Sequence, residues 1–178
     1  MKRLVYILPA IGFVVLAVVL FRSLFLSPTF LPSTLIDKPA PMLEIAALDD
    51  QTQGFGPREL AGGHVSVINV FGSWCAECHV EAPAMMQLAR EQGFELYGLV
   101  QRDTPEKIRA FLAQTGNPFS RIANDIDGRA GIEWGVYGAP ETFVVDGRGV
   151  IRYKLIGPLD AQRLKNELMP AIRAAAAG

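Results

Sequence analysis

Cysteine is nearly absent from this chain, which has only two among its 178 residues, Cys75 and Cys78. A structural disulfide framework is excluded, because two sulfurs this close in sequence close a loop too short to stabilise a fold much. The chain also lacks an excess of either charge. Its formal net charge is −1, so no basic field favours nucleic acid as a partner. Both sulfurs therefore belong to one site, with the spacing of a reactive dithiol.

Charge is absent from Leu4 to Phe21, a run that follows Lys2 and Arg3. The run is long enough to span a bilayer, and the positive charges before it favour a cytoplasmic N-terminus with the rest of the chain across the membrane. A cleaved signal peptide is the alternative, although the run exceeds the usual length and no convincing cleavage site follows. The sequence thus predicts an N-terminus and anchor over residues 1–26, with residues 4–26 in the membrane.

Prolines recur from Ser27 to Pro41, which suits a semi-extended tether. We therefore expect a linker at residues 27–36 and one domain at residues 37–173. Residues 174–178, rich in alanine, are expected to form a frayed tail. A domain of this size can bury its own core.

Apolar periodicity predicts an α/β order of elements along the domain. Strands are expected at residues 42–48, 65–71, 94–100, 141–145 and 150–154, and helices at residues 76–91, 103–115 and near the C-terminus. The buried helix faces are expected to carry Val80, Ala84 and Leu88, then Leu164, Leu168 and Ile172, with a kink at Pro170. Residues 117–135 read as irregular, and Asp125–Gly128 as a plain turn, since most ligands of a calcium loop are missing. Asp146–Gly149 predicts a hairpin, which makes the sheet mixed, with helices on both faces.

The two cysteines lie where a predicted strand, Val65–Phe71, runs into a predicted helix. Free N–H groups of a first helical turn stabilise a thiolate. Cys75 is therefore expected to be the nucleophile, and Cys78, one turn further on, the resolving thiol. Glu77 places a carboxylate beside the thiols, which stabilises a thiolate little and favours a reducing dithiol.

His79 completes the string Cys75-x-x-Cys78-His79, by which haem is attached in c-type cytochromes. Haem attachment would place the motif on an N-terminal helix of an all-helical domain. The β-branched strand before the motif argues against this interpretation. His79 is expected to be a residue of the helix surface.

Residues outside the dithiol support a narrower interpretation. Pro83 lies eight residues past Cys75, where thioredoxins kink the active-site helix, and Gly138-Ala139-Pro140 precedes the predicted hairpin. In these features the domain resembles thioredoxin. The string Gly135–Phe143, Glu81 in the active-site helix, the inserted segment after the second helix and the apolar N-terminus are similar to the CcmG/DsbE family of bacterial cytochrome c maturation.

This resemblance covers about Asp37 to Ile172 and implies an α/β thioredoxin fold, a mixed central sheet flanked by helices on both faces, plus one N-terminal transmembrane helix. It implies a protein-disulfide reductase anchored in the bacterial inner membrane, with its catalytic domain in the periplasm. Such a protein reduces the cysteines of apocytochrome c, or of a partner dithiol protein, and receives electrons from a membrane thiol carrier of the CcdA/DsbD type. The Cys75–Cys78 disulfide is its redox group, and no cofactor or metal is implied.

The resemblance also implies roles for the loop before the hairpin. Pro140 is expected to be cis and to pack against the disulfide, so that the Ala139 backbone can pair with an extended substrate. From the residues alone, a trans proline at the start of an edge strand is equally consistent. Tyr137 and Gly138 belong to the same substrate-binding loop. Trp74 is either a platform that shields the sulfurs or ordinary packing.

Glu81 falls one helical turn after Cys78 and is the family's candidate to accept the proton of that thiol. The buried aspartate usual in thioredoxins would fall at Asn69, which cannot take a proton. A merely solvated glutamate is the alternative, and a pKa raised by burial would distinguish the two.

Some features depart from the family or leave other functions open. Gln101-Arg102 stands where the family often has a Tyr-Lys pair, so the role of that tyrosine is open here. A general periplasmic reductase, a haem-bearing electron carrier and a structural tether remain alternatives. A peroxidase is disfavoured, because Cys75 lacks the Pro-x-x-x-Thr-x-x-Cys setting.

Overall fold

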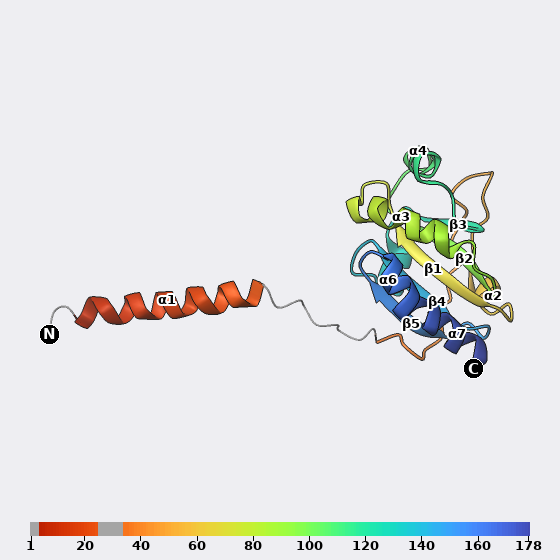
Figure 1. Cartoon of the computed structure of the whole chain (residues 1–178). Helices are drawn as coiled ribbons and strands as arrows, with labels where there is room; N and C mark the ends of the chain where they lie inside the picture. Colours follow the sequence, from red (N-terminus) through yellow and green to blue (C-terminus); the bar gives the residue numbers. More distant parts are fainter. Residues whose placement is uncertain (1–3, 25–33) are drawn as a thin grey trace. The chain divides into compact units, whose positions relative to one another are not determined.

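A computed structural model describes residues 4–24 and 34–178 of the chain, which divides into two units, Met1–Pro32 and Ser33–Gly178 (Figure 1). Residues 27–33 of the predicted linker lie outside the described residues. The first unit contains helix α1 (Leu4–Leu24), whose side chains are described from residue 11 to residue 22. Among the residues described, no helix is long and apolar enough to cross a membrane. The transmembrane helix predicted over residues 4–26 is thus not found in the described part of the chain.

The second unit is built on a five-stranded sheet in the order β3-β2-β1-β4-β5. The strands are β1 (Val65–Phe71), β2 (Phe94–Gln101), β3 (Arg121–Asp125), β4 (Glu141–Val145) and β5 (Ile151–Ile156). Strands β1, β2 and β3 pair in parallel, whereas β4 pairs antiparallel with both β1 and β5. The predicted mixed sheet is therefore confirmed, and β1, at its centre, is buried along its whole length.

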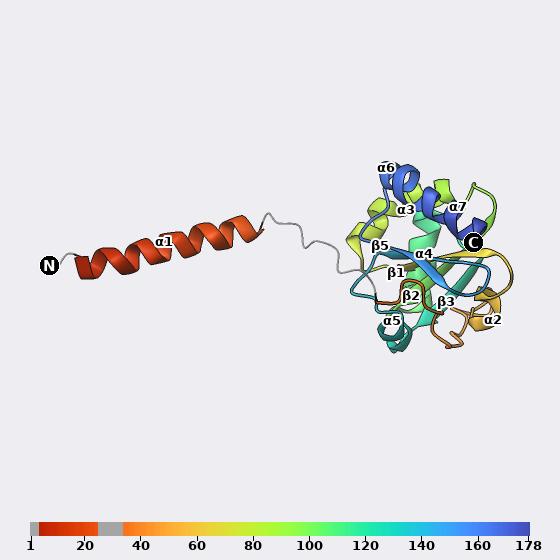
Figure 2. The same ribbon diagram turned by 90° about the horizontal axis from the view of Figure 1, so that it is seen from below.

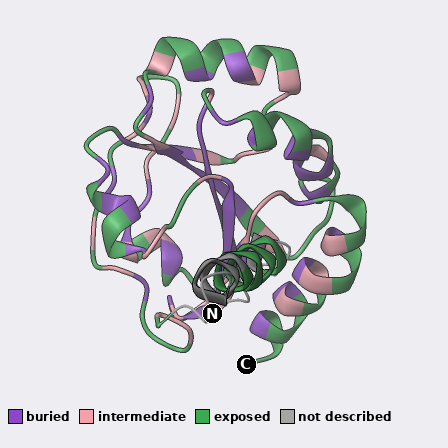
Figure 3. Cartoon of the chain, turned by 90° about the vertical axis from the view of Figure 1, so that its left-hand side faces the viewer, coloured by how far each residue is buried: buried purple, intermediate pink, exposed green. Residues whose placement is uncertain are grey.

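Helices cover both faces of this sheet, as predicted. They are α2 (Pro57–Leu60), α3 (Ala76–Leu88), α4 (Pro105–Thr115), α5 (Arg129–Glu133), α6 (Ala161–Arg163), the π-helical turn η1 (Leu164–Leu168) and α7 (Met169–Ala177). Figure 2 shows α3, α6 and α7 on one side of the sheet and α2 and α5 on the other. In Figure 3 the buried residues gather on the strands and on the inward sides of the helices. Parallel strands need this covering because both of their faces are apolar.

The helix boundaries follow local signals in the sequence. Helix α4 begins after Thr104 with Pro105 in its first turn and ends at Gly116, whose φ of 88° is a conformation that favours glycine. In the C-terminal segment, Leu164, Leu168 and Ile172 are buried as predicted. The helix does not fray at residue 174, however, but continues to Ala177, because Ala175 packs into the same cluster.

Two other predictions about local structure are wrong. Residues 42–48 form only isolated bridges, Ile45 with Phe55 and Ala47 with Ala123, and no strand. The segment 117–135 is not irregular, because it contains β3 and α5. At its centre, the Asp125 carboxylate accepts hydrogen bonds from the N–H groups of Ala130 and Gly131 and so caps α5. Charged and polar residues at exposed positions hide the short apolar pattern of these elements.

The end of the proline-rich segment also differs from the predicted tether. Asp37 donates its N–H to the carbonyl of Ile151, and the Ile151 N–H donates to Lys38, so this segment extends the edge of the sheet beside β5. Leu35 and Ile36 pack against the core on the same face. Residues 35 and 36 therefore belong to the domain, whose predicted start was residue 37.

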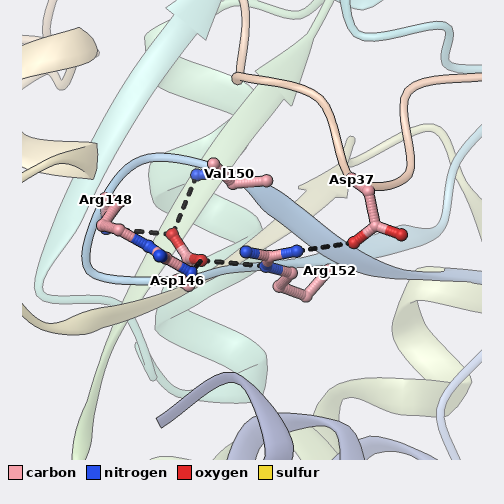
Figure 4. A network of polar contacts seen from close by, with 5 residues as sticks. All are labelled: Asp37, Asp146, Arg148, Val150 and Arg152. Carbon is pink, nitrogen blue, oxygen red and sulfur yellow. Dashed lines mark hydrogen bonds and ion pairs between the residues drawn. The ribbon is translucent and has the colours of Figure 1, made fainter. Parts of the chain in front are cut away.

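A buried aspartate fixes the junction between this edge segment and the hairpin (Figure 4). The Asp146 carboxylate accepts hydrogen bonds from the N–H groups of Arg148 and Val150 and contacts the Arg152 guanidinium at 2.8 Å. Arg152 also reaches Asp37, at 2.6 Å. Burial alone would raise the pKa of Asp146, but the hydrogen bonds from Val150, Arg152 and Arg148 outweigh it and lower the pKa from 3.8 to about 2.

Replacing this aspartate is expected to destabilise the domain. A carboxyl whose pKa is lowered on folding adds stability above its unfolded pKa and loses it as the pH falls through its folded pKa. Asp146→Asn should therefore lower the free energy of unfolding at pH 7 by about 2 kcal/mol. Urea denaturation at pH 7 and pH 2 measures this difference, which should vanish at the lower pH. An equal loss at both pH values would show that the charge of Asp146 contributes nothing.

Candidate active site

The two cysteines form a disulfide at the end of β1 and the beginning of α3. Cys75 is the N-cap of α3, the Cα atoms of the pair are 5.3 Å apart, and the Cys78 N–H donates to Cys75 Sγ at 3.1 Å. Cys75 is 5 % exposed and Cys78 1 % exposed. The sulfur that caps the helix lies in the field of its N-terminus, where a thiolate is stabilised. This geometry supports Cys75 as the attacking sulfur and suits a redox dithiol rather than haem thioethers.

Three contacts hold the loop that carries the disulfide. The Ser73 N–H donates to the Asp103 carboxylate at 2.7 Å, and His79 Nε2 lies 3.2 Å from the Ser73 carbonyl oxygen. The Trp74 indole donates to the Gln101 carbonyl at 3.1 Å. The contact with Asp103 was not predicted, because Asp103 lies 30 residues from Ser73. Its position just after a predicted parallel strand was the available signal, since such strand ends meet at one edge of a sheet.

Trp74 and His79 are both exposed beside the disulfide. Trp74 keeps 56 % of its surface accessible although its indole N–H is bonded. It therefore does not serve as core packing, one of the two roles expected for it. His79 is exposed on α3, as predicted, and its ring packs edge-on against Phe111. Val80, predicted to be buried, is 74 % exposed, so α3 presents this apolar residue to solvent.

Glu81 is buried under the disulfide, with 1 % of its surface exposed. Its Oε1 accepts a hydrogen bond from Asn69 Nδ2, and its Oε2 accepts one from the Leu159 N–H, both at 3.0 Å. Burial raises the pKa of Glu81 from 4.5 to about 7, although the bonds from Leu159 and Asn69 oppose the rise. A solvated surface glutamate is therefore excluded, and this carboxyl changes charge near neutral pH.

A small cavity connects this carboxyl with the resolving sulfur. Cys78, Glu81 and Asn69 line it together with apolar residues that include Met85 and Phe111. Its volume is about 10 Å³, roughly the space that one water molecule requires. Glu81 and Cys78 therefore border the same small space.

The loop before β4 provides the other wall of the site. The Ala139–Pro140 peptide bond is cis, as the family resemblance implied, and Ala139 packs against the cluster that contains both cysteines. Pro140 is buried, whereas Gly138 is exposed and Tyr137 is 63 % exposed. The structure thus brings Trp74, the disulfide and Ala139 together, with Tyr137 and Gly138 on the same loop. An extended chain can pair with such an exposed backbone segment.

Comparison with known proteins supports the same assignment. The model of the AhpC/TSA family matches residues 36–154. The thiol:disulfide interchange protein DsbE of Allochromatium vinosum is 44 % identical over 160 residues, which cover 90 % of this chain and 88 % of that protein. The chain belongs to the DsbE family. DsbE of Pseudomonas aeruginosa is 39 % identical over 170 residues, which cover 96 % of this chain and 93 % of that one.

Solved structures of DsbE proteins show the same fold. A structure described as a thiol:disulfide interchange protein DsbE from Chlorobium tepidum superposes with a TM-score of 0.65 at 25 % identity, over 78 % of this chain and 95 % of that chain. The DsbE relatives, the thioredoxin-like fold and the disulfide Cys75–Cys78 together make this chain a thiol-disulfide oxidoreductase.

Proposed function

We propose that this DsbE-family protein is a membrane-anchored periplasmic reductant that delivers electrons to the cysteines of apocytochrome c, or of a partner dithiol protein, during cytochrome c maturation. The observation that carries the proposal is the pairing of the buried disulfide with Glu81, whose pKa is about 7. A carboxyl with this pKa can exchange a proton with Cys78 at neutral pH, as a dithiol that is oxidised and reduced repeatedly requires.

The reaction transfers two electrons and needs no group beyond the two sulfurs. The Cys75 thiolate attacks one sulfur of the substrate disulfide, which breaks the substrate S–S bond, releases one substrate thiolate and forms a mixed disulfide. Glu81 accepts the proton of Cys78. The Cys78 thiolate then attacks Cys75 Sγ, the mixed disulfide breaks, and the second substrate thiolate leaves. The Cys75–Cys78 disulfide remains and is recharged by two electrons from a membrane thiol carrier of the CcdA/DsbD type.

The loop around Pro140 and the exposed side chains near the disulfide support a polypeptide substrate. Ala139 offers backbone groups to an extended chain, and the exposed Trp74 and Val80 offer apolar surface on α3 and the loop before it. In this proposal Trp74, Tyr137, Gly138, Ala139 and Pro140 bind the substrate.

The N-terminal sequence supports an anchor in the inner membrane. The charge-free run from Leu4 to Phe21 lies within one continuous helix, α1, and follows Lys2 and Arg3. The positive-inside rule then leaves the catalytic domain in the periplasm, where apocytochromes are assembled.

The reduction potential of the dithiol tests the direction of electron flow. Full-length protein in detergent is equilibrated in dithiothreitol redox buffers and followed by the fluorescence of Trp74. We expect a potential close to that of thioredoxin, about −270 mV, or moderately above it. A potential near −120 mV, that of a strong oxidant, would contradict a reductant. In cells, gene loss should remove c-type cytochromes, whereas damage confined to other disulfide proteins would indicate a general reductase.

A further inference from the structure

A buried ion pair lies behind the loop that contains Pro140. Lys154 Nζ on β5 lies 2.9 Å from Glu141 Oε2 on β4, and the side chains are 3 % and 1 % exposed, respectively. Two buried charges require strong compensation, because removing them from water costs several kcal/mol each. The reductase mechanism uses neither group, and the sequence analysis singled out neither.

Both charged groups also bind the backbone or ring of the loop itself. Lys154 Nζ donates to the Gly135 carbonyl at 2.7 Å and lies 4.1 Å from the centre of the Tyr137 ring. Glu141 Oε1 accepts a hydrogen bond from the Tyr137 N–H at 3.0 Å. The ion pair therefore links Gly135 to Tyr137 through the side chains of Lys154 and Glu141.

Gly135 and Tyr137, linked in this way, lie in the loop whose backbone a substrate would meet. The Gly135 backbone has a φ of 61°, and Gly138 is exposed with open space where a side chain would be, so the loop sequence itself adds little rigidity. At its two ends the loop is held by backbone bonds, because the N–H groups of Gly135 and Val136 donate to carbonyls of α5 and the Gly157 N–H donates to the Pro140 carbonyl at 3.0 Å. Between these ends, the side chains of Glu141 and Lys154 hold Tyr137 through its N–H and its ring.

We propose that Glu141 and Lys154 are positioning residues, which hold the loop from Gly135 to Pro140 and the exposed Tyr137 ring in the conformation that receives a polypeptide substrate. The proposal rests on the proposed reductase function and deepens it, because it separates the recognition of polypeptides from the chemistry of the dithiol. A small disulfide that reaches Cys75 without pairing to the loop does not need this arrangement. A polypeptide that pairs with Ala139 does, because loss of preorganisation weakens its binding.

The test compares disulfides of different size. A double variant, Glu141→Met with Lys154→Met, replaces the ion pair by apolar side chains of similar volume, a replacement that buried ion pairs often tolerate, and removes the acceptor of the Tyr137 N–H. Stopped-flow measurements give the rate constants of the reduced full-length protein with oxidised insulin, with a peptide containing an oxidised Cys-x-x-Cys-His sequence, and with hydroxyethyl disulfide. We expect kcat/KM to fall about tenfold on both polypeptides, through KM, and to change less than roughly twofold on hydroxyethyl disulfide.

A conservative variant and a direct measurement of the loop serve as controls. Lys154→Arg keeps the positive charge and the donors, so it should retain wild-type rates on all three substrates. In the double variant, the amide of Tyr137 should lose most of its protection from hydrogen exchange while the amides of β1 keep theirs. Wild-type rates on insulin in the double variant, or an equal loss on hydroxyethyl disulfide, would overturn the proposal.

The two proposals fail in different ways in this experiment. A wild-type protein that reduces insulin as well as the Cys-x-x-Cys-His peptide, or better, would contradict the specialised cytochrome function. The comparison between wild type and double variant on insulin would still decide the role of the ion pair.

Discussion

Replacing Cys75 by serine is expected to abolish disulfide reduction, whereas replacing Cys78 should leave a protein that attacks its substrate once and stays bound to it. Cys75 caps α3, so its thiolate is stabilised by the first turn of that helix. Serine cannot act as the attacking group in disulfide exchange, and the rate should fall by roughly three orders of magnitude or more. Cys78→Ser keeps the attacking sulfur but lacks the resolving one, which makes the mixed disulfide the end product.

The two variants are compared on the same substrate with a control for reactivity. Mass spectrometry and non-reducing electrophoresis should show a covalent complex between Cys78→Ser and an oxidised Cys-x-x-Cys-His peptide. Alkylation of the single remaining thiol should be faster in Cys78→Ser than in Cys75→Ser, because Cys78 is more deeply buried. A stable complex formed by Cys75→Ser instead would reverse the assigned order of the two sulfurs.

Replacing Glu81 by glutamine should slow the resolution of the mixed disulfide and remove its dependence on pH near neutrality. The ionised carboxylate is the form that accepts a proton, and burial raises the pKa of Glu81 to about 7. In the wild type, the rate of resolution should therefore rise with pH through about 7. Loss of a general base costs typically two orders of magnitude or more, so Glu81→Gln should be about a hundredfold slower than the wild type above pH 7, with a rate that does not change through neutral pH.

The stability of the same variant gives an independent measurement. A carboxyl whose pKa is raised on folding adds stability that is fully present below its unfolded pKa of 4.5 and is lost as the pH rises to about 7. The wild type should lose about 3 kcal/mol of unfolding free energy across this range from Glu81, and Glu81→Gln should not. Stopped-flow kinetics and urea denaturation between pH 4 and pH 9 test both effects. An unchanged pH profile of the rate in Glu81→Gln would assign the proton to another group.

Local sequence determined most of the order of elements and the identity of the dithiol. The strand at 65–71 and the helix at 105–115 follow from continuous apolar runs and from turn residues such as Pro105 and Gly116, whose conformations are set within a few residues. The reactive pair followed from two cysteines at a strand-to-helix junction. The cis bond at Pro140 could not be derived from the residues alone and came from the family resemblance.

Only the tertiary structure decided the environment of these groups. Burial raises the pKa of Glu81 to about 7, against the opposing effect of hydrogen bonds from Asn69 and Leu159, which lie 12 and 78 residues away in the sequence. The pairing of Lys154 with Glu141 depends on two strands that lie side by side. The contact of Asp103 with Ser73 depends on strand ends that meet at one edge of the sheet. Periodicity in a sequence reports which residues avoid water, but pKa values and ion pairs depend on distances between segments that the chain brings together only when it folds.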